Sequence, residues 1–218
     1  MAREGIPFIL VFLIPAAIFF FLAWWVAAAA CAALALFMAF FFRDPNRDCP
    51  DQADKLIVSP ADGRVVIAAK IDPNRNDSPT QVSIFLSPLD VHINRSPIAG
   101  QIVDVVYKPG AFHVASKDIA SVENEQNIIT IRGAGVELDV RQIAGVLARR
   151  VVLWKKKGDS VSLGERIGLM KFSSRMDVLI PDGFDVLVKK GDRVVGGVTP
   201  LARRAPKPDS ETTASDKR

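Results

Sequence analysis

The most constraining feature of this sequence is an uncharged apolar run near its N-terminus. No Asp, Glu, Lys or Arg occurs in the 37 residues from Ile6 to Phe42. As one straight helix this run would be about 55 Å long, whereas the hydrocarbon core of a bilayer is about 30 Å thick. A hairpin of two short helices that bends near Ala23–Trp25 fits better, because tryptophan favours the headgroup level. A signal peptide is the competing interpretation, but its apolar core is only about 7–15 residues long.

Basic residues flank the apolar run on both sides and indicate its orientation. Arg3 precedes the run, and Arg43 and Arg47 follow it. A hairpin places both flanks on one side of the membrane, and positively charged flanks stay in the cytoplasm. We therefore expect residues 1–45 to form an anchor of two transmembrane helices in the inner cell membrane. The rest of the chain is then cytoplasmic.

The remainder of the chain has the pattern of a β protein. Short runs rich in Val and Ile alternate with Gly, Pro, Asp and Asn, which is typical of strands and turns. Helical periodicity is scarce, and the best candidate is Ala115–Asn124 with Ser116 as its N-cap. We expect one mostly β domain over residues 46–204 with one or two short helices, and a disordered tail over residues 205–218. The expected strands are Gly63–Ala69, Gln81–Leu86, Gly100–Tyr107, Asn127–Arg132, Val136–Ile143 and Val178–Ile180.

A short internal repeat refines this expectation. The sequence Lys-Lys-Gly-Asp-Ser-Val at 156–161 returns 33 positions later as Lys-Lys-Gly-Asp-Arg-Val at 189–194. Gly-Asp after a basic pair marks a tight turn that enters a strand, because glycine supplies a positive φ. Two such hairpins predict a barrel-sandwich with quasi-twofold symmetry, as in lipoyl and biotinyl carriers. Similar hairpins with no functional content are the alternative.

Charge and cysteine content exclude several classes of function. The formal net charge is +4, and the basic residues form no single block, so we expect no nucleic-acid partner. The two cysteines, Cys31 and Cys49, and the two histidines, His92 and His113, are too few for a disulfide framework or most zinc sites. We expect no bound metal.

Four segments carry polar residues in patterns that could support chemistry. Each alone is compatible with an ordinary turn, a structural histidine, a helix end or a solvated loop. The segments are Ser59-Pro60-Ala61-Asp62-Gly63, the stretch from Phe85 to Pro97 around His92, Asn124-Glu125-Gln126-Asn127, and the stretch from Gly168 to Val178 around Ser173-Ser174.

Together, these segments resemble the phosphatidylserine decarboxylase family, in particular its small bacterial form. The resemblance covers nearly the whole chain and depends on the order and spacing of the motifs. Further matching motifs are Phe41-Phe42-Arg43-Asp44-Pro45 at the end of the apolar run, Lys108-Pro109-Gly110, and Val198-Thr199-Pro200-Leu201.

The resemblance implies a precursor that cuts itself between residues 173 and 174. The Ser174 hydroxyl would attack the carbonyl group of Ser173, giving a β chain of residues 1–173 and an α chain that begins at Ser174. Ser174 would become a pyruvoyl group, which accepts electrons during loss of CO₂ as PLP does elsewhere. No separate cofactor is then needed.

The resemblance also assigns the residues that serve this chemistry. His92 would be the base that activates the serine and later the acid that returns a proton, and Asp62 would orient it. Arg95 and Lys171 are the candidates for binding the substrate. His113 lies outside the family motifs and is expected to be an ordinary surface or packing residue.

Two positions depart from the family pattern. Ser173 stands where the small form usually has glycine, which would slow cleavage and also makes Ser173 an alternative nucleophile. Arg95 stands where the long form has a second histidine. The run Arg175-Met176-Asp177-Val178 matches the residues after the family's nucleophile, which favours Ser174.

The expected reaction is conversion of phosphatidylserine to phosphatidylethanolamine and CO₂ in phospholipid biosynthesis. Relatives that act on archaetidylserine leave the lipid tails open. The resemblance also implies a dimer or larger homo-oligomer. Two other functions fit the sequence: an uncleaved degenerate homologue with a lipid-binding role, and a membrane-anchored, carrier-like β-sandwich adaptor.

Overall fold

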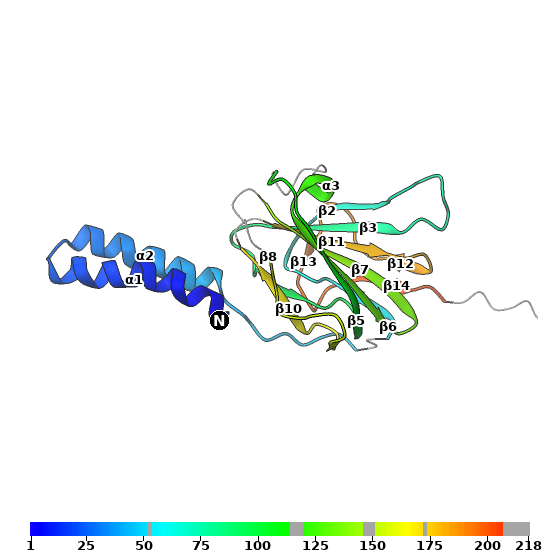
Figure 1. Ribbon diagram of the computed structural model, residues 1–218, viewed down its shortest axis with the longest axis horizontal. Helices are drawn as coiled ribbons and strands as arrows, with labels where there is room; N and C mark the ends of the chain where they lie inside the picture. The colour runs from blue at the N-terminus through cyan, green and yellow to red at the C-terminus, as the bar shows by residue number, and fades with distance from the viewer. Residues whose placement is uncertain (52–53, 114–119, 146–150, 172–173, 207–218) are drawn as a thin grey trace, which may run out of the picture.

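The N-terminal apolar run forms a helical hairpin that projects from one end of a β domain (Figure 1). The structure is a computed structural model that describes residues 1–51, 54–113, 120–145, 151–171 and 174–206. A 3₁₀ turn, Arg3–Gly5, leads into α1 (Ile6–Phe21), and α2 (Trp25–Phe41) returns beside it. Ala23 makes the bend with a φ of +60°. The predicted hairpin and its turn at Ala23–Trp25 are therefore confirmed.

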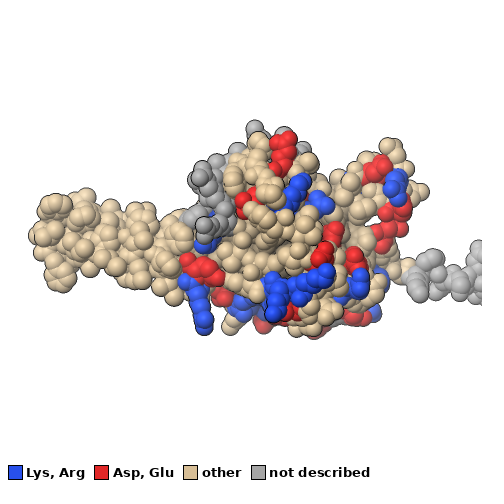
Figure 2. Space-filling view, in the orientation of Figure 1, with Lys and Arg blue, Asp and Glu red and all other residues tan. Residues whose placement is uncertain are grey.

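The surface of the hairpin is apolar. Residues 3–21 are long and apolar enough to cross a bilayer, whereas α2 is a shorter apolar helix. In the space-filling view the hairpin carries no charged side chain, and charges begin where it meets the β domain (Figure 2). Phe21, Trp24, Trp25 and Val26 at its tip are all more than half exposed. Such an exposed apolar surface needs a lipid or protein environment.

The described part of the β domain is built around one curled eight-stranded sheet. Its strand order is β13-β2-β3-β11-β7-β6-β5-β9, and every neighbouring pair is antiparallel. The predicted strands are confirmed, usually to within one residue at each end. The bounds are β2 (Gly63–Lys70), β3 (Thr80–Leu86), β5 (Gly100–Lys108), β6 (Gln126–Gly133), β7 (Val136–Ile143), β9 (Ser160–Val161), β11 (Ser174–Ile180) and β13 (Arg193–Val194).

Two small sheets and one short helix complete the described fold. One sheet has the order β1-β14-β12 and the other β4-β10-β8. A single turn of helix, α3 (Ala120–Glu123), lies within the predicted helix, whose residues 115–119 fall outside the described residues. The strands are β1 (Leu56–Val58), β4 (Ile93–Arg95), β8 (Val151–Leu153), β10 (Arg166–Met170), β12 (Phe184–Val186) and β14 (Pro200–Arg204). The predicted mostly β class is confirmed.

The internal repeat marks the two edges of the large sheet. Gly158 and Gly191 both have positive φ, +95° and +100°. The carbonyl group of Asp159 accepts a hydrogen bond from the β5 residue Ile102 at 2.9 Å, and that of Asp192 accepts one from the β2 residue Val65 at 2.9 Å. The two turns therefore occupy equivalent places on opposite edges, as the predicted quasi-twofold symmetry requires.

The core of the β domain consists of aliphatic side chains from both halves of the sheet. Ile84, Val178 and Ile131, on β3, β11 and β6, are fully buried in one cluster. Burial of each such side chain contributes roughly 1.5–3 kcal/mol. This core fixes β11 at the centre of the sheet, and with it the position of Ser174.

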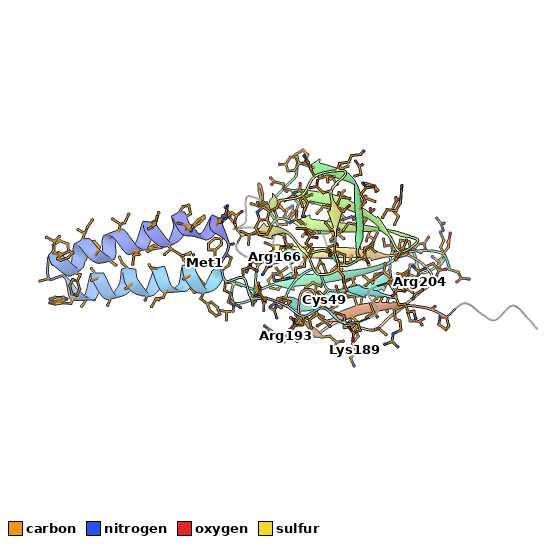
Figure 3. The ribbon with its side chains drawn as sticks, turned by 90° about the horizontal axis from the view of Figure 1, so that it is seen from below. Met1, Cys49, Arg166, Lys189, Arg193 and Arg204 are labelled. Atoms are coloured by element: carbon orange, nitrogen blue, oxygen red, sulfur yellow. The ribbon has the colours of Figure 1, made fainter. Side chains whose placement is uncertain are left out.

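The end of the β domain that faces the hairpin is joined to it by a connection that begins after α2, residues 42–47. Met1 and Arg166 lie near this junction, whereas Arg204 lies at the opposite end (Figure 3). Arg166 Nε donates a hydrogen bond of 2.7 Å to Asp44 in the connection. The predicted tail begins at residue 205, and residues 207–218 fall outside the described residues.

Candidate active site

Ser174 is the first residue of the central strand β11. It lies opposite Leu86 of β3, and the next residue pairs with Ile143 of β7, so strands hold it on both sides. Ser174 is fully buried, and its Oγ has no hydrogen-bond partner among the described residues. A buried hydroxyl without a partner costs roughly 1–3 kcal/mol, so its presence calls for a functional reason. The neighbouring Ser173, which the predicted cleavage requires, lies outside the described residues.

His92 lies in the loop between β3 and β4 and is also fully buried. Its Nδ1 lies 3.0 Å from the carbonyl oxygen of Asp90. A carbonyl oxygen only accepts, so Nδ1 carries the proton and Nε2 keeps its lone pair. Nε2 has no partner among the described residues. Within the described part of the chain, His92 thus presents a buried acceptor nitrogen without a partner.

Burial also determines the charge of His92. Desolvation lowers its pKa from 6.5 to about 4, and the positive charge of Arg43 acts in the same direction. The hydrogen bond to the Asp90 carbonyl and the charge of Asp90 oppose this shift but do not overcome it. The imidazole is therefore neutral near pH 7, which is the state that a general base requires.

Ser174 is close in the sequence to a residue that is hydrogen-bonded to His92. The backbone N–H of Met170, the last residue of β10, donates to the His92 carbonyl group at 3.1 Å. Ser174 follows four positions later, and four residues of extended chain span at most ~14 Å. The fold therefore brings together two regions that are 82 positions apart in the sequence, 92 and 174.

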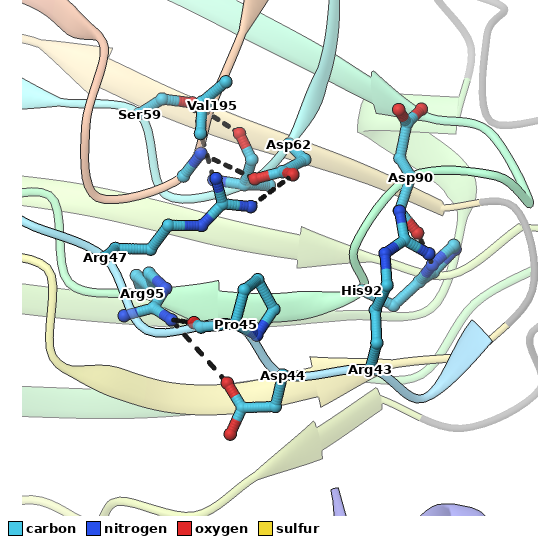
Figure 4. Close-up of polar contacts among 12 residues, drawn as sticks. Arg43, Asp44, Pro45, Arg47, Ser59, Asp62, Asp90, His92, Arg95 and Val195 are labelled. Carbon is cyan, nitrogen blue, oxygen red and sulfur yellow. Dashed lines mark hydrogen bonds and ion pairs between the residues drawn. The ribbon is translucent and has the colours of Figure 1, made fainter. Parts of the chain in front are cut away.

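Asp62 has partners other than His92. Its Oδ2 accepts from Arg47 Nη2 at 2.8 Å, and its Oδ1 accepts from the Gly196 backbone N–H at 2.8 Å (Figure 4). No described hydrogen bond joins Asp62 to His92. The orienting role of Asp62 therefore stays a prediction, and the described contacts give that role to the Asp90 carbonyl group.

The internal symmetry indicates that Asp62 is not needed for the turn itself. Ser59-Pro60-Ala61-Asp62-Gly63 has a counterpart in Ser96-Pro97-Ile98-Ala99-Gly100, which leads into β5 as the first leads into β2. Ser59 and Ser96 each donate their hydroxyl group to the carbonyl oxygen two residues on, at 2.6 Å. The same turn thus forms with alanine in place of Asp62.

The two candidate substrate-binding residues differ in their surroundings. Arg95 is nearly buried, and it donates to the carbonyl oxygens of Gly164 at 3.0 Å and Pro45 at 2.8 Å. Lys171 is partly exposed, and its Nζ lies 5.2 Å from the centroid of the Phe8 ring in α1. Lys171 is therefore freer to meet a ligand, and both roles stay predictions.

The remaining histidine lies outside this group. His113 Nε2 is 2.9 Å from a carboxylate oxygen of Glu123, and both side chains are substantially exposed. This is the surface position expected for His113.

Two features of the site carried no clear signal in the sequence. A fully buried ion pair joins Arg175 and Asp177 on β11, with Nε and Oδ1 2.7 Å apart. Arg175 also donates to Ser83 at 2.7 Å, and the Ser121 hydroxyl donates to Asp177 at 2.6 Å. This network ties the strand that begins with Ser174 to β3 and α3. The only hint of this network in the sequence is that Arg175 and Asp177 have opposite charges and stand two positions apart, which places them on the same face of a strand.

The second feature is a chain of buried amides that includes Asn94 of β4, two positions after His92. Gln142 Nε2 donates to Asn94 Oδ1 at 2.8 Å, and Asn127 Nδ2 donates to Gln142 Oε1 at 3.3 Å. Asn94 Nδ2 has no partner among the described residues. It is a buried donor available to a developing negative charge.

Comparison with known proteins adds an independent line of support. The family model described as phosphatidylserine decarboxylase matches residues 34–202. A phosphatidylserine decarboxylase proenzyme from Solibacter usitatus is 51% identical over 171 residues, which is 78% of this chain and 80% of that protein.

Two further relatives cover nearly the whole chain. The phosphatidylserine decarboxylase proenzyme of Solidesulfovibrio magneticus is 42% identical over 94% of this chain and 96% of its own length. That of Symbiobacterium thermophilum is 43% identical over 93% of this chain and 95% of its own length. The similarity therefore includes both the hairpin and the β domain.

Proposed function

Because the chain belongs to the phosphatidylserine decarboxylase family and is a phosphatidylserine decarboxylase made as a proenzyme, we propose that it activates itself at Ser174. The observation that carries this proposal is the buried Ser174 hydroxyl without a described partner, at the head of the central strand. The adaptor and the uncleaved homologue leave this hydroxyl unexplained. Release of CO₂ from phosphatidylserine by the purified chain in detergent micelles tests the activity.

The surroundings of Ser174 fit a pyruvoyl group made from that residue. Such a group supplies a carbonyl that withdraws electrons from the substrate as CO₂ leaves. It needs no more space than the serine, because it lacks the backbone nitrogen. β3 pairs with position 174 and β7 pairs with the next residue, so neighbouring strands fix its place. Among the described residues, Asn94 Nδ2 and His92 Nε2 are buried polar atoms without a partner, and we expect them to face this group.

Self-cleavage begins when His92 Nε2 takes the proton of the Ser174 hydroxyl. The serine oxygen attacks the carbonyl carbon of residue 173, and the peptide C–N bond breaks to give an ester. Elimination of the ester leaves a carboxylate on residue 173. Water then replaces the nitrogen of residue 174, which departs as ammonia.

The buried base accounts for the expected pH dependence. A base with a pKa of about 4 transfers protons slowly, and a reaction that occurs once per chain tolerates a slow step. We expect the cleavage rate to stay level from neutral pH to about pH 5 and to fall as His92 is protonated near pH 4. Timed denaturing gels of freshly made precursor measure this rate.

Stability must be followed in the same experiment. The folded pKa of His92 lies below its ordinary value of 6.5, so the unfolded state binds more protons between about pH 6.5 and 4. Stability conferred by neutral His92 is present above pH 6.5 and is lost as pH falls through this window. Circular dichroism at each pH separates unfolding from protonation of the base. A cleavage rate that halves near pH 6.5 in folded protein would contradict the assignment of His92.

The two chains remain associated after the cut. The α chain contributes β11, β12, β13 and β14. Of these, β11, β13 and β14 each pair with a strand of the β chain, and β12 pairs with β14. β11 alone joins β3 on one side and β7 on the other. The new N-terminus therefore stays in the middle of the sheet.

Ser173 sets the speed of the cut. Glycine has no Cβ and adopts more backbone conformations than serine, so we expect Ser173→Gly to keep self-cleavage or to speed it up. The half-time of precursor loss on a denaturing gel measures the effect, with Ser162→Gly in an exposed turn as the matched control. Loss of cleavage in Ser173→Gly would mean that the serine pair is itself required.

The hairpin anchors the enzyme to the membrane that holds its substrate. Both helices cross the bilayer, with Trp24 and Trp25 at the far headgroup level and the β domain on the cytoplasmic side.

Asp62 supports the site through Arg47, and Lys171 and Arg95 bind the phosphate or carboxylate of the headgroup. The serine headgroup is the reacting part, so phosphatidylserine and archaetidylserine both fit this chemistry. The enzyme works as a homo-oligomer.

A further inference from the structure

Phe41, the last residue of α2, and the connection that follows it, residues 42–47, contact three residues to which the proposed function gives a role, namely His92, Asp62 and Arg95. The Phe41 ring lies on the His92 ring, with centroids 4.1 Å apart. Arg47 pairs with Asp62 at 2.8 Å, and the Pro45 carbonyl group accepts from Arg95 at 2.8 Å (Figure 4). A simple tether would need none of these contacts.

The end of the hairpin next to the β domain, residues 2–8 and 41–43, is called its foot here. The foot is packed as tightly as a protein core. Phe41 and Phe42 are fully buried, with ring centroids 5.0 Å apart. Phe42 also stacks on Phe8 of α1 at 5.3 Å, and its carbonyl group accepts from the Ala2 N–H at 2.9 Å. A Cβ on Gly5 would lie 2.5 Å from the Phe42 side chain, so only glycine fits there. Such packing holds Phe41 in one place.

Two polar contacts lock the foot onto the β domain. Arg43 Nη2 donates to the carbonyl oxygen of Leu89 at 2.7 Å, three residues before His92. Trp154 Nε1 donates to a carboxylate oxygen of Glu4 at 2.6 Å, which ties the start of the hairpin to the residue after β8. Both ends of the hairpin are thus fastened to the β domain, one of them at the loop that carries His92.

Phe41 covers one face of the imidazole whose Nδ1 edge is held by the Asp90 carbonyl group. The charged groups that act on His92 are Asp90 on its own loop and Arg43 after α2. Arg193 of β13 pairs with Asp90 at 2.6 Å and offsets part of its charge. Removal of the Phe41 ring would admit water without changing any of these charges.

We propose that Phe41, the last residue of the membrane hairpin, is a positioning residue that orients His92 and keeps it neutral. The foot of the anchor is therefore one wall of the active site. This inference rests on the proposed role of His92 as the base. It also places the reaction at the level where the hairpin leaves the bilayer, so the serine headgroup reaches the site without extraction of the lipid.

The test uses the two histidines of the chain as reporters. In a Ser174→Ala background, which stays uncut, ¹⁵N-histidine spectra of the full chain in micelles give the titration of His92 and His113. We expect Phe41→Ala to raise the His92 midpoint from about 4 towards 6.5 and to leave His113 unchanged. Phe21→Ala, at the exposed tip of the hairpin, is the matched control and should shift neither histidine.

A purely structural role for Phe41 makes a different prediction. It would lower stability and the cleavage rate equally at all pH values, with the His92 midpoint unchanged in the folded protein. That result would overturn the inference. If Phe41→Ala does not fold, Phe41→Leu keeps apolar cover but loses the flat ring, and we expect a smaller rise of the His92 midpoint. A wild-type midpoint together with a wild-type cleavage rate in Phe41→Leu would equally overturn it.

Failure of the proposed function would have another signature. The effect of Phe41 on the His92 titration can be measured without cleavage, whereas the proposed role of Ser174 concerns cleavage itself. Cutting of the Ser174→Ala chain at the normal position would refute the proposed function. It would not change the expected effect of Phe41→Ala on the His92 midpoint.

Discussion

Replacement of Ser174 by alanine is expected to leave a single uncut chain with no decarboxylase activity. The substitution removes the oxygen that attacks the carbonyl group of residue 173 and the only source of the pyruvoyl group. It deletes one buried hydroxyl that makes no described hydrogen bond, so the fold should lose little stability. A denaturing gel and CO₂ release from phosphatidylserine measure the two losses.

The matched control is Ser173→Ala, which tests the choice between the two serines. If Ser174 is the nucleophile, Ser173→Ala should still be cut between residues 173 and 174. If instead Ser173→Ala stays whole while Ser174→Ala is cut, Ser173 is the nucleophile and the register assigned here is wrong by one residue.

Replacement of His92 by alanine is expected to slow self-cleavage by about 10²- to 10⁴-fold, the usual contribution of a general base. The neutral ring and its unused Nε2 are what the reaction loses. The substitution also leaves a space beneath Phe41, so folding must be checked by circular dichroism. The ratio of the precursor half-times of His92→Ala and the unchanged chain, followed over days, measures this effect.

His113→Ala is the control for this experiment. His113 pairs with Glu123 on the surface, and surface pairs contribute about 0–1 kcal/mol, so cleavage should proceed at the normal rate. Normal cleavage in a folded His92→Ala chain would show that another group takes the serine proton.

Local patterns in the sequence were sufficient to predict much of the fold. Alternating Val and Ile runs identified β2, β3, β5, β6 and β7, because each strand buries one face against the core. The Lys-Lys-Gly-Asp repeat identified two equivalent turns, because Gly158 and Gly191 both need a positive φ. The length of the uncharged run was enough to predict the hairpin.

Contacts between distant parts of the chain could not be predicted in the same way. The motif around Asp62 suggested a link to His92, but the nearest cation to Asp62 comes from Arg47 in the connection. Asp90 acts through its backbone carbonyl group, which no side-chain pattern reveals. Phe41 read as one more apolar residue of a membrane helix, and only the folded chain places its ring on His92.

The family relationship decides between the functions that the sequence left open. Relatives named as proenzymes cover both the hairpin and the β domain, so an adaptor that shares only the β-sandwich is not favoured. The uncleaved homologue is not favoured either. Ser173 precedes the expected cleavage point, and the experiments on that residue address its role directly.

The most direct test of the account is the intact mass of the purified protein. Self-cleavage at Ser174 predicts two species, residues 1–173 and residues 174–218, and the smaller should carry a pyruvoyl group that blocks N-terminal sequencing. A single chain of 23.7 kDa after long incubation at neutral pH would contradict the account.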